Sequence, residues 1–139
     1  GALFLMIGML YERAHRRGIA DFGGLAARAP RLAFVFTLVT LSSIGLPGLN
    51  GFVGEVLSLA GAAVFYPAAA AVGVLGTVLA AWYLLPAYQK VFWAPAGPGS
   101  VSELVHDLDL RERGLLWAFC ALIVWIGIAP GPLLRLLQP

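Results

Sequence analysis

Residues 45–55 read GLPGLNGFVGE, a cluster of helix-breaking residues followed by one carboxylate, Glu55, with apolar sequence on both sides. Proline lacks a backbone N–H donor, and glycine readily adopts non-helical backbone angles. An asparagine in such a cluster could also cap the helix that follows it. The stretch therefore predicts a helix that is interrupted near residues 45–51, and the residues that predict the break are Gly45, Pro47, Gly48, Asn50 and Gly51.

The composition of the chain decides which solvent surrounds this break. Of 139 residues, 60% are hydrophobic and 12% are charged, and the mean hydropathy is +0.89. A small soluble domain could not bury several apolar runs that each approach the length needed to cross a bilayer. We therefore expect an all-helical, multi-pass membrane protein, built as a polytopic bundle of transmembrane helices.

Four apolar segments alternate with more polar loops. The expected membrane spans cover residues 1–11, 32–64, 68–92 and 114–128, and the expected loops cover residues 12–31 and 94–112. The first segment is too short to cross alone and begins without a Met, so we expect it to be the end of a truncated helix. As one straight helix the second segment would be roughly 50 Å long, far more than the membrane is thick, so it must tilt, protrude or break.

Arginine residues set the expected orientation. The 12–31 loop holds five arginines against two acidic residues, whereas the turn near Pro67 carries no charge. By the positive-inside rule the 12–31 loop is cytoplasmic, and the 94–112 loop then faces the same side. An isoelectric point near 9.0 would also permit a nucleic-acid surface, but arginines beside membrane spans are more often topology signals. We therefore expect contact with membrane lipid and no nucleic acid.

Glu55 is the main functional candidate. An ionisable group within a membrane span costs roughly 2.5–3.5 kcal/mol on insertion scales, so it persists mainly where it is used or paired. Opened backbone at membrane depth persists only where it is buried in protein or lines water, so the break itself indicates a polar interior. Burial favours the neutral acid, while the positive end of the following half-helix favours the carboxylate, and near balance would allow protonation to change during a working cycle. In the structural alternative, Glu55 only pairs with a basic residue of a neighbouring helix.

Other polar residues give further candidates. Hydroxyl groups just before the break could form a polar path, although such groups often bond back to their own helix; they belong to Thr37, Thr40, Ser42 and Ser43. Lys90 is a candidate for ion transfer, against the ordinary interpretation that its ammonium group snorkels to the lipid headgroups. His15 and His106 lie in loops without a second ligand at metal spacing, so we expect no metal site.

Three stretches of the chain carry a family resemblance: GALFLMIGMLYERAHRRGIADFGGLA at 1–26, GLPGLNGFVGE at 45–55 and AYQKVFW at 87–93. They closely resemble the C-terminal part of the subunit M family of bacterial NADH:quinone oxidoreductase, respiratory complex I, whose mitochondrial counterpart is NADH dehydrogenase subunit four. The related L-type and N-type subunits, and the multi-subunit sodium/proton antiporters, usually resemble GIPPLAGFxxK here, with lysine at the position of Glu55. The acid after GFVG therefore indicates the M type.

The resemblance implies an antiporter-like bundle with two inverted five-helix repeats, each containing a discontinuous helix. This chain would hold the last helices, with residues 32–64 as the second broken helix. Glu55 would belong to the half-channel through which a proton leaves toward the outside. The other channel residues of the family are absent from this sequence: a lysine pair and an acid lie on earlier helices, and a histidine lies shortly before the stretch that matches Gly1.

The resemblance also implies the surroundings of the chain. It would be a proton-translocating subunit in the bacterial inner membrane, beside L-type and N-type antiporter-like subunits, coupling electron transfer from NADH to quinone to proton transport. It would carry no cofactor itself, since NAD, quinone, flavin and iron–sulfur clusters belong to partner subunits. The alternatives are a subunit of a multi-subunit sodium/proton antiporter, a subunit of a membrane-bound hydrogenase, or a purely structural membrane subunit.

Overall fold

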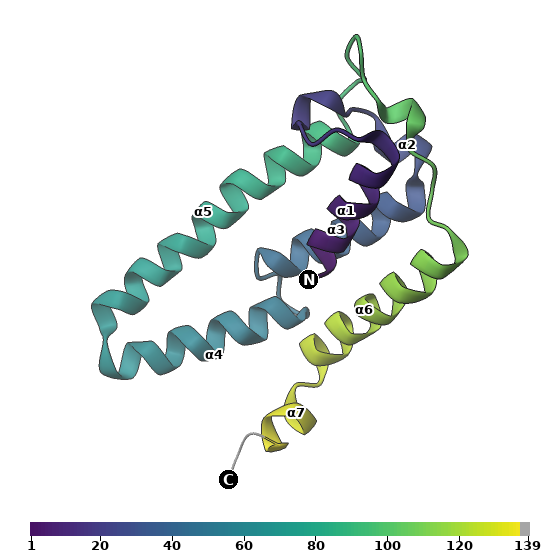
Figure 1. Ribbon diagram of the computed structural model, residues 1–139. Coiled ribbons are helices and arrows are strands. Elements are labelled where there is room, and N and C mark those ends of the chain that lie inside the picture. Colours follow the sequence, from purple (N-terminus) through teal and green to yellow (C-terminus); the bar gives the residue numbers. More distant parts are fainter. Residues whose placement is uncertain (137–139) are drawn as a thin grey trace.

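Helices dominate the computed structural model, which describes residues 1–136 and contains no strand within them (Figure 1). The longer helices are α1 (Ala2–Ala14), α3 (Pro30–Ser43), α4 (Asn50–Phe65), α5 (Pro67–Phe92) and α6 (Leu110–Ile128). The shorter elements are η1 (Ile19–Asp21), α2 (Leu25–Arg28), η2 (Ser102–Leu104) and α7 (Gly131–Leu136). The prediction of an all-helical fold is confirmed.

Proline and a capping interaction fix where several helices begin. Pro30 and Pro67 occupy the first positions of α3 and α5. A backbone N–H at this position has no carbonyl partner within the helix, so proline, which lacks the N–H, loses no hydrogen bond there. At the start of α6 the backbone N–H of Asp109 donates to the Glu112 carboxylate at 2.9 Å, which is half of a capping box. This start lies within the loop expected at residues 94–112, so α6 is longer than the apolar run that predicted it.

The arrangement of the helices places α3 at the centre of the packing. α1, α2, α5 and α6 all contact α3, and α6 continues along α4. α4 and α5 form an antiparallel hairpin that projects from the rest of the chain (Figure 1). The buried core lies where α1, α3 and α6 meet the C-terminal end of α5, and its largest fully buried side chains include Met6, Leu32, Phe92 and Leu116.

α5 is the one described helix that is by itself long and apolar enough to cross a membrane. Only 6% of its most apolar window is buried inside the chain. Val72, Leu79 and Trp82 accordingly stand exposed. An apolar surface of this length suits contact with lipid or with other membrane helices far better than contact with water.

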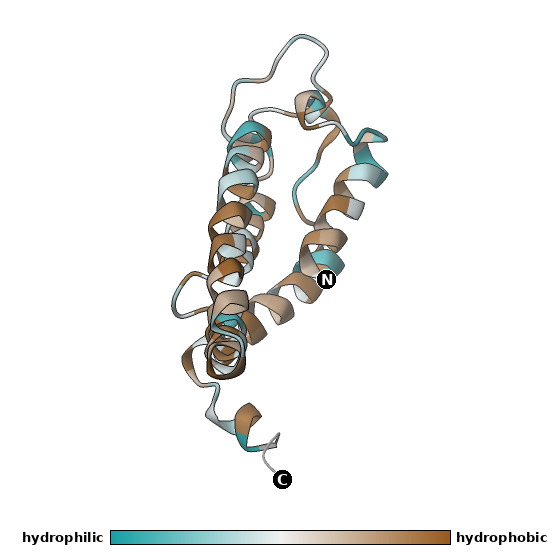
Figure 2. Cartoon of the chain, turned by 90° about the vertical axis from the view of Figure 1, so that its left-hand side faces the viewer, coloured by the Kyte–Doolittle hydropathy of each residue, from teal (hydrophilic) through white to brown (hydrophobic). Residues whose placement is uncertain are grey.

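The two polar loops lie together at one end of the helices, and Figure 2 shows that hydrophilic residues gather at that end while hydrophobic residues dominate the helices. The buried N–H of Gly23 donates to the Ser102 hydroxyl at 2.9 Å. The N–H of Leu32, near the start of α3, donates to the Asp107 carboxylate at 3.1 Å. These bonds join the 12–31 and 94–112 loops into one layer, as expected of loops on one side of a membrane; which side that is stays a prediction.

The ion pair between Arg13 and Glu112 is expected to stabilise this loop layer. The Nη2 atom of Arg13 lies 2.5 Å from the Oε2 atom of Glu112, and the two side chains are only 16% and 23% exposed. Replacing Arg13 by Ala would leave the carboxylate partly buried without its cation, so we expect a loss of roughly 1–2 kcal/mol in the free energy of unfolding. The thermal midpoint of the purified full-length protein in detergent would report this loss.

Arg28→Ala is the matched control, because Arg28 pairs with Glu103 at 3.2 Å while both side chains are more than half exposed. Exposed pairs contribute roughly 0–1 kcal/mol, so this variant should unfold near the wild-type temperature. Equal losses in the two variants would contradict a special role for the Arg13–Glu112 pair.

Candidate functional site

Residues 44–49 are not helical and separate α3 from α4. α3 ends in a Schellman motif, in which the N–H of Gly45 donates to the carbonyl of Ser42 at 3.2 Å. In the second bond of the motif, the N–H of Leu46 donates to the carbonyl of Leu41 at 3.0 Å. Gly45 has a φ of 75°, a left-handed angle that glycine adopts without the clash of a Cβ. The helix therefore stops at a defined turn whose freed carbonyls are bonded.

A polar link joins the two helices across this break. The hydroxyl of Ser42 donates to the side-chain oxygen of Asn50 at 2.5 Å. The N–H of Gly51 donates back to the Ser42 hydroxyl at 3.4 Å. Gly51 also lies against the Ser42 carbonyl so closely that a Cβ there would overlap it. The start of α4 is thus held directly against the end of α3.

Asn50 does not take the capping position that the sequence suggested. Leu49 is the N-cap of α4, and Asn50 is the first helical residue. The Asn50 side chain turns to the Ser42 hydroxyl instead of to the N–H groups of its own helix, because α3 ends within its reach. Its contribution is therefore a bond between helices.

Glu55 lies on the first turns of α4 and is partly buried. Its side chain folds back to the break: a Cβ on Gly45 would come within 2.9 Å of the Glu55 carboxyl carbon. Among residues 1–136, no basic side chain forms an ion pair with it. The break therefore places a carboxylate directly against the bare Cα of a glycine.

A cavity of about 270 Å³ lies beside the break. Its polar lining comes from Ser42, Ser43 and Asn50, and its apolar lining includes Val39 of α3 and Ile123 of α6. The break thus brings three of the predicted polar residues to one cavity. Neither Glu55 nor the two threonines singled out from the sequence line it.

Two of the four hydroxyls of α3 bond to their own helix. Thr37 donates to the carbonyl of Ala33 at 2.7 Å, and Ser43 donates to the carbonyl of Val39 at 2.9 Å. Thr40 is 1% exposed, and its hydroxyl has no hydrogen-bond partner among the described residues. A polar path through these groups stays a prediction, and Thr40 is the member with an unused donor at the protein interior.

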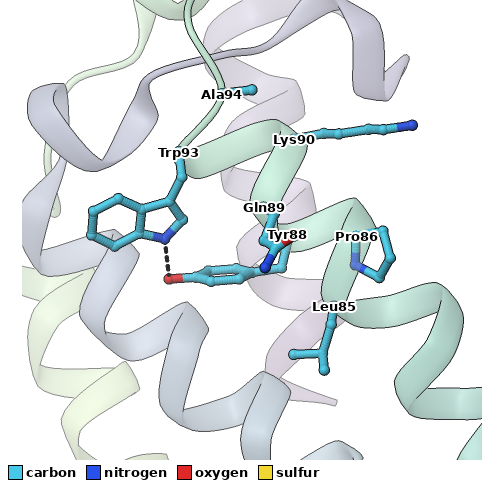
Figure 3. A pocket seen from close by; sticks show the side chains of 7 residues that line it. All are labelled: Leu85, Pro86, Tyr88, Gln89, Lys90, Trp93 and Ala94. Atoms are coloured by element: carbon cyan, nitrogen blue, oxygen red, sulfur yellow. Dashed lines mark hydrogen bonds between the residues drawn. The ribbon is translucent and has the colours of Figure 1, made fainter.

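Lys90 lies far along α5, in an open depression on the surface lined also by Tyr88 and Trp93 (Figure 3). Its side chain points away from the bundle, while the indole N–H of Trp93 donates to the Tyr88 hydroxyl at 2.9 Å. Tyr88 in turn lies 2.5 Å from the Thr37 hydroxyl. The structure therefore separates Lys90 from the break, and an ammonium group in this position can reach a membrane surface.

Gly127 of α6 contacts the break, and the sequence analysis did not single it out. A Cβ at this position would lie 2.5 Å from the carbonyl carbon of Gly48 and would also overlap Leu49. Gly48 itself has a φ of 93°, and the neighbouring Pro47 is exposed. The only available signal was a glycine within an apolar helix, which a sequence cannot connect to a turn far away along the chain.

Residues 1–80 match the family described as "NADH:quinone oxidoreductase/Mrp antiporter, TM". The chain belongs to this family. It is 39% identical over 136 residues to NADH-quinone oxidoreductase subunit M of Rickettsia typhi, covering 96% of this chain and 27% of that protein. It is 40% identical over 139 residues to NADH-quinone oxidoreductase subunit 13 of Thermus thermophilus, covering 100% of this chain and 29% of that protein.

A solved structure gives the same result for the fold. Respiratory complex I from Thermus thermophilus with bound NADH contains a chain that aligns with a TM-score of 0.83 and 40% identity, over 93% of this chain and 27% of that chain. The predicted resemblance is confirmed, and so is the assignment to a membrane protein. This member of the antiporter-like family spans a little over a quarter of the length of these relatives.

Gly127→Ala is expected to displace the break in this antiporter-like chain. The added methyl group would meet backbone atoms that cannot rotate away, and overpacking of this kind typically costs about 1–3 kcal/mol. The thermal midpoint of the purified full-length protein in detergent should therefore fall.

Gly114→Ala on the same helix is the control, since nothing lies within 4 Å of a Cβ there. Alanine is the better helix former by roughly 0.5–1 kcal/mol, so this control should be neutral or slightly stabilising. A Gly127 variant that behaves like the Gly114 variant would contradict the close packing of α6 on the break.

Proposed function

We propose that this chain works within a proton-translocating, antiporter-like subunit M of NADH:quinone oxidoreductase, in the bacterial inner membrane. The observation that carries the proposal is 35–40% identity, over essentially the whole chain, to relatives of that name. The subunit would couple electron transfer from NADH to quinone to proton transport. As the family resemblance implies, it would perform no redox chemistry through this chain, because the redox cofactors would belong to partner subunits.

We further propose that α3 and α4 are the two halves of one discontinuous membrane crossing. Three features support this: both helices are apolar, each is shorter than a full span, and the N-terminus of α4 is bonded to the C-terminus of α3. The turn between α4 and α5 lies at the end of the molecule opposite the polar loops (Figure 1). If those loops are cytoplasmic, as their arginines indicate, then α4 occupies the outer half of the membrane.

In this arrangement Glu55 is the proposed proton-transfer group of the outward half-channel. Its carboxyl group lies against Gly45 at the break, on the helix that begins there. A carboxyl group can accept and release a proton, and opened backbone at membrane depth is found where it is buried in protein or lines water. The proton would come from groups on helices outside this chain and leave toward the outer side.

The partners proposed from the family are the L-type and N-type antiporter-like subunits of the membrane arm, together with lipid. The family name also includes the Mrp antiporters. The subunits that purify with the protein would therefore distinguish a role in NADH:quinone oxidoreductase from a role in an antiporter. Purification of the intact parent protein with NADH-oxidising subunits would support the proposal. Purification with antiporter subunits alone, or with hydrogenase subunits, would replace it with one of the other transport functions.

Glu55→Gln in the full-length parent protein should lower NADH-driven proton pumping in membrane vesicles at least tenfold, because an amide cannot titrate; this magnitude is on the order expected for one essential proton-transfer group. Glu55→Asp should retain most of the pumping, since it keeps a carboxyl group. Pumping would be followed with a pH-sensitive dye, and native gels would establish that the complex assembles.

Glu103→Gln is the matched control, because Glu103 is a carboxylate of the loop layer with a side chain that is 78% exposed. It should pump at the wild-type rate. Normal pumping by the assembled Glu55→Gln variant would make Glu55 a structural residue at most and would favour the alternative of a purely structural membrane subunit.

A further inference from the structure

A narrow groove runs between α1 and α5 and ends at the polar loop layer. Its volume is about 230 Å³. α1 contributes Leu3, Ile7 and Leu10, at the three- and four-residue spacing of one helix face, so the groove follows α1 for roughly 10 Å. α5 contributes the opposite wall through Leu84, Ala87, Tyr88 and Val91, and Phe36 of α3 forms part of the lining between them.

The mouth of this groove is basic. Arg16 and Arg17 line it at the end nearest the loop layer, and both are exposed. The guanidinium group of Arg17 lies over the ring of Tyr11, 4.2 Å from its centroid. This stacking holds one cation in place at the groove.

These two arginines differ from the other three of the same loop. Arg13, Arg28 and Arg31 each lie within 4.0 Å of a carboxylate. Within residues 1–136, neither Arg16 nor Arg17 forms an ion pair. The loop therefore neutralises the arginines that face its own layer and leaves positive charge where the apolar groove opens.

We propose that this groove binds an anionic phospholipid, with one acyl chain between α1 and α5 and the phosphate held by Arg16 and Arg17. The combination of a long apolar wall and a paired cationic mouth matches an amphiphile that has one charged end. Guanidinium groups bind phosphate oxygens through paired, charge-assisted hydrogen bonds. Basic pockets between transmembrane helices on the cytoplasmic side are a recurring site for anionic headgroups.

The size of the groove favours an acyl chain over other occupants. A helix with side chains is roughly 10–12 Å in diameter and would need much more room. An extended acyl chain is thin, and part of it would lie along an apolar groove of this length. The proposal rests on the membrane location of the family and is independent of the role of Glu55.

The test uses the full-length parent protein in its assembled complex, reconstituted into phosphatidylcholine vesicles that contain a photoactivatable phosphatidylglycerol. After illumination, mass spectrometry of the peptides would locate the labelled residues. Labelling should concentrate on the α1 and α5 residues that line the groove, and a photoactivatable phosphatidylcholine should label them several-fold less.

The double variant Arg16→Gln/Arg17→Gln should reduce this labelling roughly ten- to thirty-fold, the effect expected from removing two cations near an anionic headgroup. The control Arg28→Gln/Arg31→Gln removes the same charge from the same loop, outside the groove, and should keep labelling within about twofold of wild type. Ala87→Leu should reduce the labelling while leaving both arginines in place, because it fills the groove from α5.

Three results would each overturn the proposal. In the first, the Arg16/Arg17 double variant keeps full labelling although the complex is assembled. In the second, phosphatidylcholine labels the groove as strongly as phosphatidylglycerol. In the third, the wild-type groove is not labelled at all, which would mean that another protein segment fills it.

Discussion

The interruption between α3 and α4 depends on satisfying backbone groups that a continuous helix would have bonded internally. Where such groups are buried, each needs a hydrogen-bond partner within the protein. The Schellman motif supplies partners for carbonyls of α3, and the Ser42 hydroxyl receives the N–H of Gly51. The break is therefore an ordered structure with its own hydrogen bonds, and the positions of the surrounding side chains follow from it.

Glycine serves two purposes at this site. At Gly45 the left-handed backbone angle ends α3, and the missing side chain leaves the space that the Glu55 carboxyl occupies. At Gly51 and Gly127 the missing side chains let α4 and α6 approach the backbone of the break. Gly45, at which α3 ends, thus also makes room for the acid beside it, which links the fold to the proposed site.

The sequence predicted those features that depend on local chemistry. Gly45 and Pro47 indicated where helix is absent, the apolar runs indicated helices, and the arginine-rich loop indicated a shared polar end. It did not predict that Asn50 bonds to Ser42, or that Gly127 packs on Gly48, because both depend on which helices become neighbours. The hydrogen-bonded chain from Trp93 through Tyr88 to Thr37 was missed for the same reason, since it joins α5 to α3.

The burial of the helices is uneven, and this determines what fixes the position of Glu55. α1, α3 and α6 supply most of the buried core, whereas α4 has no fully buried residue. α3 is also anchored at the loop layer through Asp107, which accepts the N–H groups of Arg31 and Leu32. A helix without a core of its own takes its position from its contacts, and those of α4 are with α5, α6 and the end of α3. The placement of the carboxyl group therefore depends on the contacts of α4 with these three helices, including the close glycine contacts at the break, and less on full burial of the helix that carries it.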